Sequence, residues 1–416
     1  MNYLDIKSPK RAGEKEKRAS WYNYYAGFSH TFVRDVINSL SLSEKVTVLD
    51  PWNGSGATTY AAALEGHNTI GIDLNPPMFV VARSKFSSRN DVLLAIKRLK
   101  YLRINSNPIS IDCDDYLLNW FDKPTASYLR YIDCYISGGF FKSVDDKLNS
   151  FDNVSCVSYL SLFNSTRVFI SKFIASNPTW IKKTKDPSKK INIPAKMIKS
   201  LILDFLAEML ETTLPNFDNS RVEILCSDSK KLPLNDGSID LIITSPPYCT
   251  RIDYGIATSP ELAILFGYMP NEIENTRRSL IGRTTIDKMP IKSELFGELC
   301  SSFLNDVYNH SSISSATYYH KNLHQYFYDM KSSISELSRV VRTSGKFVCV
   351  VQDSFYKEIY CNLPEIINEM AVSCGFYLVN KLDFDTKINM ANINKVSKKY
   401  RDKTPAIESV LIFSRG

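Results

Sequence analysis

Cysteine pairs, long apolar runs and a secretory leader are all missing from this sequence. Its nine cysteines occur singly and form no Cys-x-x-Cys pair, which argues against a structural zinc site and against a disulfide framework. No apolar run approaches the roughly 18 residues that a membrane-spanning helix needs. Residues 1–20 are polar and rich in Lys and Arg, without the apolar region of a secretory signal. We therefore expect a cytoplasmic protein in a reducing compartment, without a membrane segment.

Histidine is scarce, with five in 416 residues. His320 and His324 are four residues apart, which would place both on one face of a helix. Metal binding needs a third ligand, and the Glu of the His-Glu-x-x-His motif is missing. We expect no metal site.

Positive charge is unevenly distributed along the chain. A formal net charge of +7 is mild evidence for a polyanionic partner. Between residues 181 and 199, seven lysines occur with a single acid, Asp186. Two interpretations are open: a solvated loop beside a helix, or a segment that contacts phosphates, which supply most sequence-independent affinity for nucleic acid. The candidate lysines are Lys182, Lys183, Lys185, Lys189 and Lys190.

Two glycines, Gly54 and Gly56, form a turn between a β-branched strand and a helix. Glycine lets the backbone pass close to a ligand, and the first turn of a helix presents free N–H groups. A second strand ends at Asp73, where an acid can accept hydrogen bonds from the two hydroxyls of a ribose. The pattern therefore predicts a ligand that contains a nucleoside.

What the turn lacks argues against a dinucleotide. The third glycine of the Gly-x-Gly-x-x-Gly fingerprint is replaced by Thr59, and an acid, Asp50, precedes the turn. S-adenosylmethionine has no pyrophosphate but carries an ammonium group, which Asp50 can help to hold. The sequence favours this ligand over a nicotinamide cofactor.

A buried strand over residues 239–244 ends abruptly in Ser245, Pro246, Pro247 and Tyr248. Two adjacent prolines continue neither a strand ladder nor a helix, so they fix an extended turn. In an open α/β sheet, ligands bind at the carboxyl ends of the strands. The turn is suited to accept hydrogen bonds from a flat exocyclic amine while Tyr248 stacks on the ring that carries the amine.

This Ser-Pro-Pro-Tyr run resembles the catalytic motif of the amino-group DNA methyltransferases, in the form found mostly among enzymes that methylate N4 of cytosine. Residues 50–56 (Asp-Pro-Trp-Asn-Gly-Ser-Gly) and 71–76 (Gly-Ile-Asp-Leu-Asn-Pro) resemble the cofactor motifs of the same family. The resemblance implies S-adenosylmethionine as the cofactor. It also implies an α/β, Rossmann-like class I methyltransferase fold, with a seven-stranded sheet whose last strand is antiparallel.

The resemblance also assigns roles to individual residues. An acid at the position of Asp228 lies near the adenine amine of the cofactor in related enzymes. The Phe-Ser-x-x-Phe-Val element at residues 28–33 has two possible roles: it holds the amino-acid end of the cofactor, or it covers the core. Ser29 or Thr31 can cap the helix that follows. The residues assigned to the cofactor are Phe28, Ser29, Thr31, Asp50, Trp52, Asn53, Gly54, Gly56, Asp73, Leu74, Asp228 and Ser245.

The organisation expected from these motifs is a catalytic domain interrupted by an insertion. Residues 1–20 form a basic leader, and residues 21–90 and 220–416 form the catalytic domain that the resemblance covers. Residues 91–219 show mainly helical periodicity and no nucleotide motif. This insertion is either a scaffold or, by its position between the motifs, a target-recognition region.

Further candidates for DNA contact follow the catalytic motif. They are Arg251, Tyr254, Arg277, Arg278 and Arg283. Solvated surface is the alternative interpretation for the arginines. The Ser-rich span 284–317 is interpreted as a loop that faces DNA.

The expected reaction is methylation of cytosine N4 in duplex DNA. Ser245 and the carbonyl of Pro246 accept the two N–H hydrogens of the amine, and Tyr248 stacks on a base that has left the duplex. Methylation of cytosine carbon 5 is excluded because the Pro-Cys pair that it requires is missing. Two alternatives stay open: methylation of adenine N6, and an inactive methyltransferase-like subunit that only binds DNA. The resemblance also implies a cognate restriction endonuclease or a phage-defence system as partner.

Overall fold

The computed structural model describes most of the chain. The described residues are 6–9, 17–24, 27–40, 42, 45–104, 109–175, 177, 179–212, 215, 217–218, 221–249, 252–287, 296–386 and 406–416. All nine cysteines are free thiols. Within these ranges, no helix has both the length and the apolar character needed to cross a bilayer.

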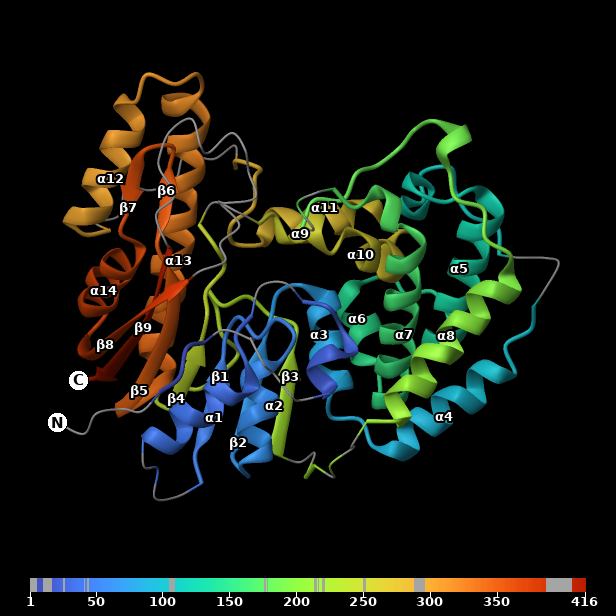
Figure 1. The fold of residues 1–416 in the computed structure, drawn as a ribbon, viewed down its shortest axis with the longest axis horizontal. Helices are drawn as coiled ribbons and strands as arrows, with labels where there is room; N and C mark the ends of the chain where they lie inside the picture. Colours follow the sequence, from blue (N-terminus) through green and yellow to red (C-terminus); the bar gives the residue numbers. More distant parts are fainter. Residues whose placement is uncertain are drawn as a thin grey trace.

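A seven-stranded sheet forms the centre of the molecule (Figure 1). Its strands, in spatial order, are β3 (Val222–Leu225), β2 (Asn68–Ile72), β1 (Thr47–Asp50), β4 (Ile239–Thr244), β5 (Val341–Gln352), β9 (Ala406–Arg415) and β8 (Phe376–Thr386). The first five are parallel. Strand β9 is antiparallel to both of its neighbours, β5 and β8. This order confirms the expected class I methyltransferase sheet.

The strand order reverses beside β1, which pairs with β2 on one side and β4 on the other. The connections after β1 and β4 therefore leave in opposite directions. A crevice opens between such connections at the carboxyl ends of the strands. Both predicted motifs, the glycine turn after β1 and the Ser-Pro-Pro-Tyr turn after β4, lie at this point.

Helical layers cover both faces of the sheet, as a parallel sheet requires. Val48 and Leu241 face one apolar cluster, whereas their neighbours Leu49 and Ile242 face another. The first layer consists of α1 (His30–Ser39) and α2 (Ala57–Leu64). The second layer consists of α12 (Glu298–Asn309), α13 (His320–Val340) and α14 (Leu363–Ser373). The prediction of a loop over 284–317 is thus wrong for α12, which buries Phe303 and Leu304 against this layer.

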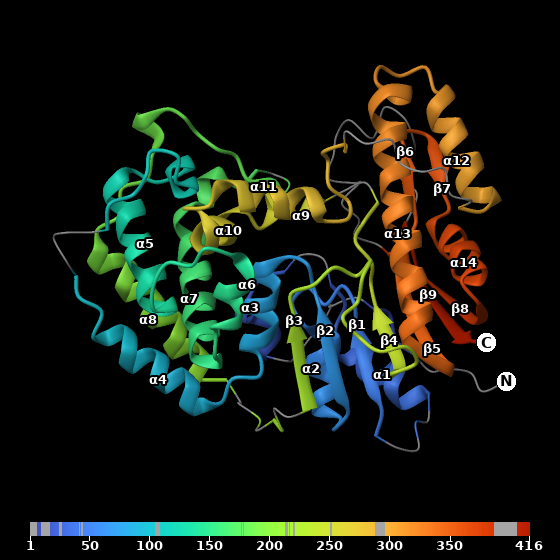
Figure 2. The ribbon, with the colours of Figure 1, turned by 180° about the vertical axis from the view of Figure 1, so that it is seen from behind.

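A helical unit lies beside the β3 edge of the sheet, as Figures 1 and 2 show from opposite sides. Its helices are α3 (Pro76–Ser84), α4 (Arg89–Lys100), α5 (Lys123–Ser137), α6 (Val144–Asn149), α7 (Asn153–Phe169) and α8 (Ala195–Leu210). They share one apolar cluster. The helical character expected for residues 91–219 is therefore observed.

Two helices that follow the catalytic motif join the same unit. Helix α10 (Ser259–Phe266) buries all eight of its residues, and α11 (Pro270–Ser279) buries Ile273; their apolar side chains belong to the cluster of the insertion. The boundary expected at residue 219 therefore separates segments that pack together. Sequence periodicity identifies helices but does not indicate which core they enter.

Buried charges tie α10 to the insertion. Arg130 on α5 pairs with Asp115 at 3.1 Å and Asp133 at 2.9 Å, and Lys147 on α6 pairs with Asp133 at 2.6 Å. The two cations also donate to carbonyls at the end of α10, at 2.8 and 2.7 Å. Carbonyls at the end of a helix lack partners within the helix and favour positive charge. Two cations and two acids thus form a closed network.

The remaining elements are short. They are η1 (Lys17–Trp21), η2 (Tyr116–Asn119), η3 (Ser171–Phe173), η4 (Pro187–Lys189), α9 (Tyr254–Ala257), the π-helix η6 (Ser315–Tyr319), and the hairpin strands β6 (Ser354–Tyr356) and β7 (Ile359–Cys361).

Candidate functional site

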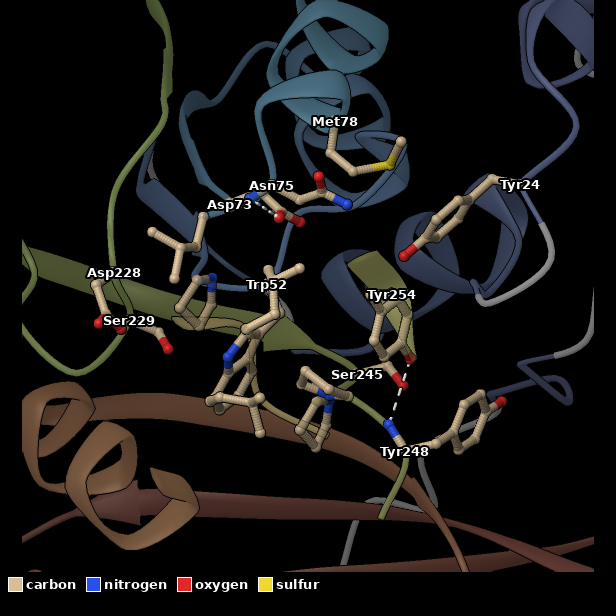
Figure 3. A pocket seen from close by; sticks show the side chains of 16 residues that line it. Tyr24, Trp52, Asp73, Asn75, Met78, Asp228, Ser229, Ser245, Tyr248 and Tyr254 are labelled. Atoms are coloured by element: carbon tan, nitrogen blue, oxygen red, sulfur yellow. Dashed lines mark hydrogen bonds between the residues drawn. The ribbon is translucent and has the colours of Figure 1, made fainter. Parts of the chain in front are cut away.

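One pocket joins the two predicted motifs (Figure 3). Of the predicted residues, its wall includes Trp52, Asp73, Leu74, Asp228, Tyr254 and residues 245–248. It also includes residues to which the sequence analysis assigned no individual role. These are Tyr24, Pro51, Asn75, Met78, Ser229, Leu280 and Ile281.

The carboxylate of Asp73 is held in place by two backbone amides. The N–H of Gly54 donates to Oδ2 at 2.8 Å, and the N–H of Asn75 donates to Oδ1 at 2.9 Å. Burial raises the pKa of Asp73 to about 6. Asp73 therefore sits at the tip of β2 as a fixed acceptor on the pocket wall.

The glycine turn needs glycine for a steric reason. Gly54 has φ of +48°, and a Cβ there would lie 2.9 Å from the ring of Tyr24. Tyr24 arrives from the N-terminal segment and lies over the turn, where Figure 3 shows its hydroxyl directed into the pocket. The backbone conformation and this close approach both exclude a larger residue at position 54.

Asn53 has a supporting position beneath the turn. Its side-chain oxygen accepts a hydrogen bond from Thr59 Oγ1 at 3.1 Å, and its N–H donates to the carbonyl of Ile72 at 2.9 Å. A Cβ on Gly71 would lie 2.3 Å from Asn53 Nδ2, so the two segments are in close contact. Asn53 is buried and does not line the pocket.

Asp50 lies behind the pocket wall. Its Oδ1 accepts from Thr244 Oγ1 at 2.6 Å and from the N–H of Trp52 at 3.1 Å, and burial raises its pKa to about 6. Thr244 directly precedes Ser245. Asp50 therefore links the carboxyl ends of β1 and β4, and its predicted contact with an ammonium group stays a prediction.

The Phe-Ser element begins helix α1. Ser29 is the N-cap, and its Oγ accepts from the N–H of Phe32 at 3.1 Å, which confirms one of the two predicted caps. Phe28 packs edge-on against Phe32 with ring centroids 5.4 Å apart, and Thr31 is exposed. None of Phe28, Ser29 and Thr31 lines the pocket, which Tyr24 reaches instead.

Asp228 approaches the pocket from the end of β3. Its Oδ1 accepts from the N–H of Lys230 at 2.9 Å. The ammonium of Lys230 lies 3.7 Å from Asp228 and 3.1 Å from Asp329 on α13. These contacts fix the loop that carries Asp228 to the helix below it.

The Ser-Pro-Pro-Tyr turn is held from two sides. Tyr326 Oη donates to the carbonyl of Pro247 at 2.9 Å. The N–H of Tyr248 donates to Tyr254 Oη at 3.3 Å, the dashed line beside Ser245 in Figure 3. Ser245 is half-buried on the pocket wall and lies opposite Asp73 and Met78. The turn thus presents a hydroxyl and an aromatic ring to whatever the pocket binds.

Two predicted DNA-binding arginines form ion pairs with buried acids. Arg283 is only 4% exposed and pairs with Asp329 at 2.6 Å, so it cannot meet a phosphate without breaking a buried ion pair. Arg277 pairs with Asp253 at 2.9 Å and donates to Thr284 at 3.0 Å. The prediction for Arg283 is corrected accordingly, whereas Arg277 keeps 23% of its side chain exposed and its contact with DNA stays a prediction.

Of the other three predicted DNA contacts, Arg278 and Tyr254 differ from each other in position. Arg278 is 46% exposed and pairs with Glu274 at 3.0 Å. Tyr254 lies on the pocket wall rather than on an outer surface. The prediction for Arg251 lies outside the described residues.

The predicted lysine segment is only partly free. Lys182, Lys183, Lys185 and Lys189 are exposed. Lys183 lies over the Tyr116 ring at 4.2 Å, and Lys189 pairs with Asp186 at 3.3 Å. Lys190 donates to the carbonyl of Thr184 at 2.7 Å, which ties it to its own loop.

Comparison with known proteins gives the following relatives. No protein-family model matches the sequence. The type II methyltransferase M.BsoBI of Geobacillus stearothermophilus is 27% identical over 304 residues, which cover 68% of this chain and 59% of that protein. M.AvaI of Nostoc sp. is 21% identical over 404 residues (88% and 80%), and M.MvaI of Kocuria varians is 22% identical over 421 residues (89% and 88%). The chain thus matches less than two thirds of the length of M.BsoBI. It is a relative of the type II methyltransferases, and it has the sheet of the class I S-adenosylmethionine-dependent methyltransferases.

Proposed function

We propose that this protein is a site-specific DNA methyltransferase that moves a methyl group from S-adenosylmethionine to the N4 amine of cytosine in duplex DNA. One observation carries the proposal: the acid suited to a nucleoside, Asp73, and the residue suited to an amine, Ser245, line the same pocket. A methyl transfer between two bound molecules requires that the donor and the acceptor meet in one place. The relatives named type II methyltransferases support the class of reaction.

The residues around Asp73 fit the proposed cofactor. The fixed carboxylate is placed to accept hydrogen bonds from a ribose, and Asp228 from the adenine amine. Glycine at position 54 lets Tyr24 lie over the turn on the pocket wall, because a Cβ there would lie 2.9 Å from the Tyr24 ring. S-adenosylmethionine supplies a methyl group that its sulfonium centre activates for transfer.

The catalytic turn prepares the amine as a nucleophile. The lone pair of an exocyclic amine is delocalised into the ring, which makes it weak. In our proposal, Ser245 Oγ and the carbonyl of Pro246 accept the two N–H hydrogens, which localises the lone pair and directs it at the methyl group. Tyr248 stacks on the base, and the two prolines keep the acceptors rigid. Such positioning by fixed dipoles requires no covalent intermediate.

The base has to leave the duplex for its amine to reach this turn. Lys182 and Lys185, two of the exposed lysines of the insertion, are proposed to contact the phosphates, and Arg278 is a further candidate. Ser245 in the first motif position supports cytosine over adenine. We also propose, from the family resemblance alone, that the protein is cytoplasmic and acts beside a restriction endonuclease or in phage defence.

Long-read sequencing of a plasmid tests the reaction, the base and the specificity together. The plasmid comes from a methylation-free host that expresses the protein, with Ser245→Ala as the inactive variant. Ser238→Ala is a matched control, because Ser238 is exposed just before the opposite end of the same strand. Methylated cytosine N4 in one short motif, lost only in Ser245→Ala, is the expected result.

The other outcomes separate the alternatives. Methylated adenine would move the chemistry to N6 and leave the role of the turn unchanged. An unmodified plasmid, together with a purified protein that does not bind S-adenosylmethionine, would overturn the enzyme and favour a subunit that only binds DNA.

A further inference from the structure

The backbone groups of the catalytic turn, from the carbonyl of Pro246 to the N–H of Tyr248, can each be assigned a hydrogen-bond partner or a role in the proposed reaction. Proline has no N–H, so Tyr248 provides the single amide of residues 246–248. That amide donates to Tyr254 Oη at 3.3 Å, and the carbonyl of Pro247 accepts from Tyr326 Oη at 2.9 Å. Two tyrosine hydroxyls therefore hold the carbonyl and the amide of the single peptide unit that joins Pro247 to Tyr248. The carbonyl of Pro246 is the acceptor that the proposed reaction uses.

Tyr326 is a fixed donor. It is buried in the cluster between the sheet and α13, and burial raises the pKa of its hydroxyl well above its ordinary range, so it stays protonated. Asp329, three residues later on α13, pairs with Lys230 at 3.1 Å and with Arg283 at 2.6 Å. Helix α13 therefore fixes three segments: the loop after Asp228, the loop that carries Arg283, and the catalytic turn.

Tyr254 is held in place by contacts between α9 and α11. It begins α9, whose N-cap Asp253 accepts from the N–H of Ile256 at 3.1 Å and pairs with Arg277 at 2.9 Å. A Cβ on Gly255 would lie 2.5 Å from Arg277 Cγ, so α9 and α11 are in close contact. The hydroxyl of Tyr254 is thus set by the segment that continues into the helical unit.

We propose that Tyr326 and Tyr254 are positioning residues for methyl transfer. They hold the Pro247 carbonyl and the Tyr248 amide, so that Ser245 Oγ and the Pro246 carbonyl keep the separation that the amine requires. This inference rests on the proposed function. A displacement of about 1 Å in a reacting group can cost on the order of 100-fold in rate, so loss of one hydroxyl is expected to lower kcat roughly 10- to 100-fold.

The test removes single hydroxyls. Tyr326→Phe and Tyr254→Phe are compared with Tyr356→Phe, which deletes a buried hydroxyl that shares a hydrogen bond of 2.5 Å with Ser315 away from the turn. Measurements are kcat at saturating DNA and S-adenosylmethionine, the KM for DNA, the Kd for S-adenosylhomocysteine and the Tm. We expect Tyr326→Phe and Tyr254→Phe to lower kcat and to leave KM and Kd within about twofold. Tyr356→Phe should change the Tm alone.

Hydrogen exchange of the peptide that covers residues 245–248 gives a readout that does not depend on activity. The Tyr248 amide should exchange faster in Tyr254→Phe than in the wild type or in Tyr356→Phe, because it loses its acceptor. Unchanged exchange, or equal losses of kcat in Tyr326→Phe and Tyr356→Phe, would overturn the positioning role. If the wild type transfers no methyl group, the proposed function fails, whereas the exchange result still decides whether the tyrosines hold the turn.

Discussion

Asp133 in the helical unit is buried and Asp73 at the pocket end of the sheet is half-buried, and the two regions supply these acids with different partners. In the helical unit, Asp133 meets the cations of Arg130 and Lys147 in a closed network. At the pocket, Asp73 accepts from two backbone amides, and the part of the chain that the structure describes places no cation in an ion pair with it. A closed network stabilises a fold, whereas an acid with spare acceptor capacity is suited to bind a ligand. The variants below test this difference.

Asp133→Ala should have the largest effect. It leaves Lys147 without its carboxylate and Arg130 with one acid instead of two, in a region closed to water. Removal of one partner from a buried ion pair typically costs about 3–5 kcal/mol. We expect the free energy of unfolding, from urea titration, to fall by that amount. Glu65→Ala removes a partly exposed pair with Arg34 and should cost about 0–1 kcal/mol. Equal losses in the two variants would show that the network does not stabilise the fold.

Asp73→Asn should leave the fold largely intact and weaken cofactor binding. A hydrogen bond to a charged group contributes about 1.5–3 kcal/mol, so the Kd for S-adenosylhomocysteine should rise roughly 10- to 150-fold. Isothermal titration calorimetry measures it, with the exposed Asp236→Asn as control. If Asp73→Asn bound as tightly as this control, the acid would not be a ligand of the cofactor.

The pH dependence of cofactor binding should follow the same carboxylate. Burial raises the pKa of Asp73 to about 6, from 3.8 in an unfolded chain. Between these values the folded protein holds a proton that the unfolded chain has lost, so this group contributes less stability as pH rises from about 4 to 6. A ribose donates to the ionised carboxylate, so affinity should rise with pH through about 6 and level off above about 7.

Affinity should fall by up to about tenfold per pH unit below 6. Asp50 also has a pKa of about 6, so a wild-type profile alone does not identify the group. The Asp73→Asn variant should lose this dependence. A profile that persists in the variant would assign it to Asp50 instead.

The sequence predicts those features of the fold and the site that depend on residues close together in the chain. The glycine turn, Asp73 and the Ser-Pro-Pro-Tyr run are local motifs at strand ends, and the fold brings them together as the parallel order requires. The position of Ser29 as a cap depends on three neighbouring residues and was also predictable. Class I topology followed from the resemblance, and the sheet order confirms it.

Contacts over long sequence separations were not predictable in this way. Arg283 resembles a surface arginine until its partner Asp329, on α13, is brought beside it. Tyr24 reaches the pocket only because the N-terminal segment crosses the glycine turn. Likewise, α10 shows helical periodicity, but the carbonyls at its end are satisfied by Arg130 and Lys147 from the insertion. A single sequence gives no signal for such pairings.

The smallest expected effects concern the exposed lysines of the insertion. Lys185→Ala should weaken DNA binding about two- to fivefold, uniformly across sequences, because a phosphate contact carries no sequence information. The dependence of log K on log salt should become shallower by about 1, since one fewer counterion is released. The matched control is Lys45→Ala, an exposed lysine just before β1, at the end of the sheet opposite the pocket. Fluorescence anisotropy between about 50 and 200 mM salt measures both slopes. Over this range, a protein with several phosphate contacts loses about 10³-fold or more of its affinity for DNA, so the slope is well determined. Equal slopes for the two variants would show that Lys185 does not contact DNA. The helical unit would then be a scaffold, and its charges would contribute to the stability of the fold alone.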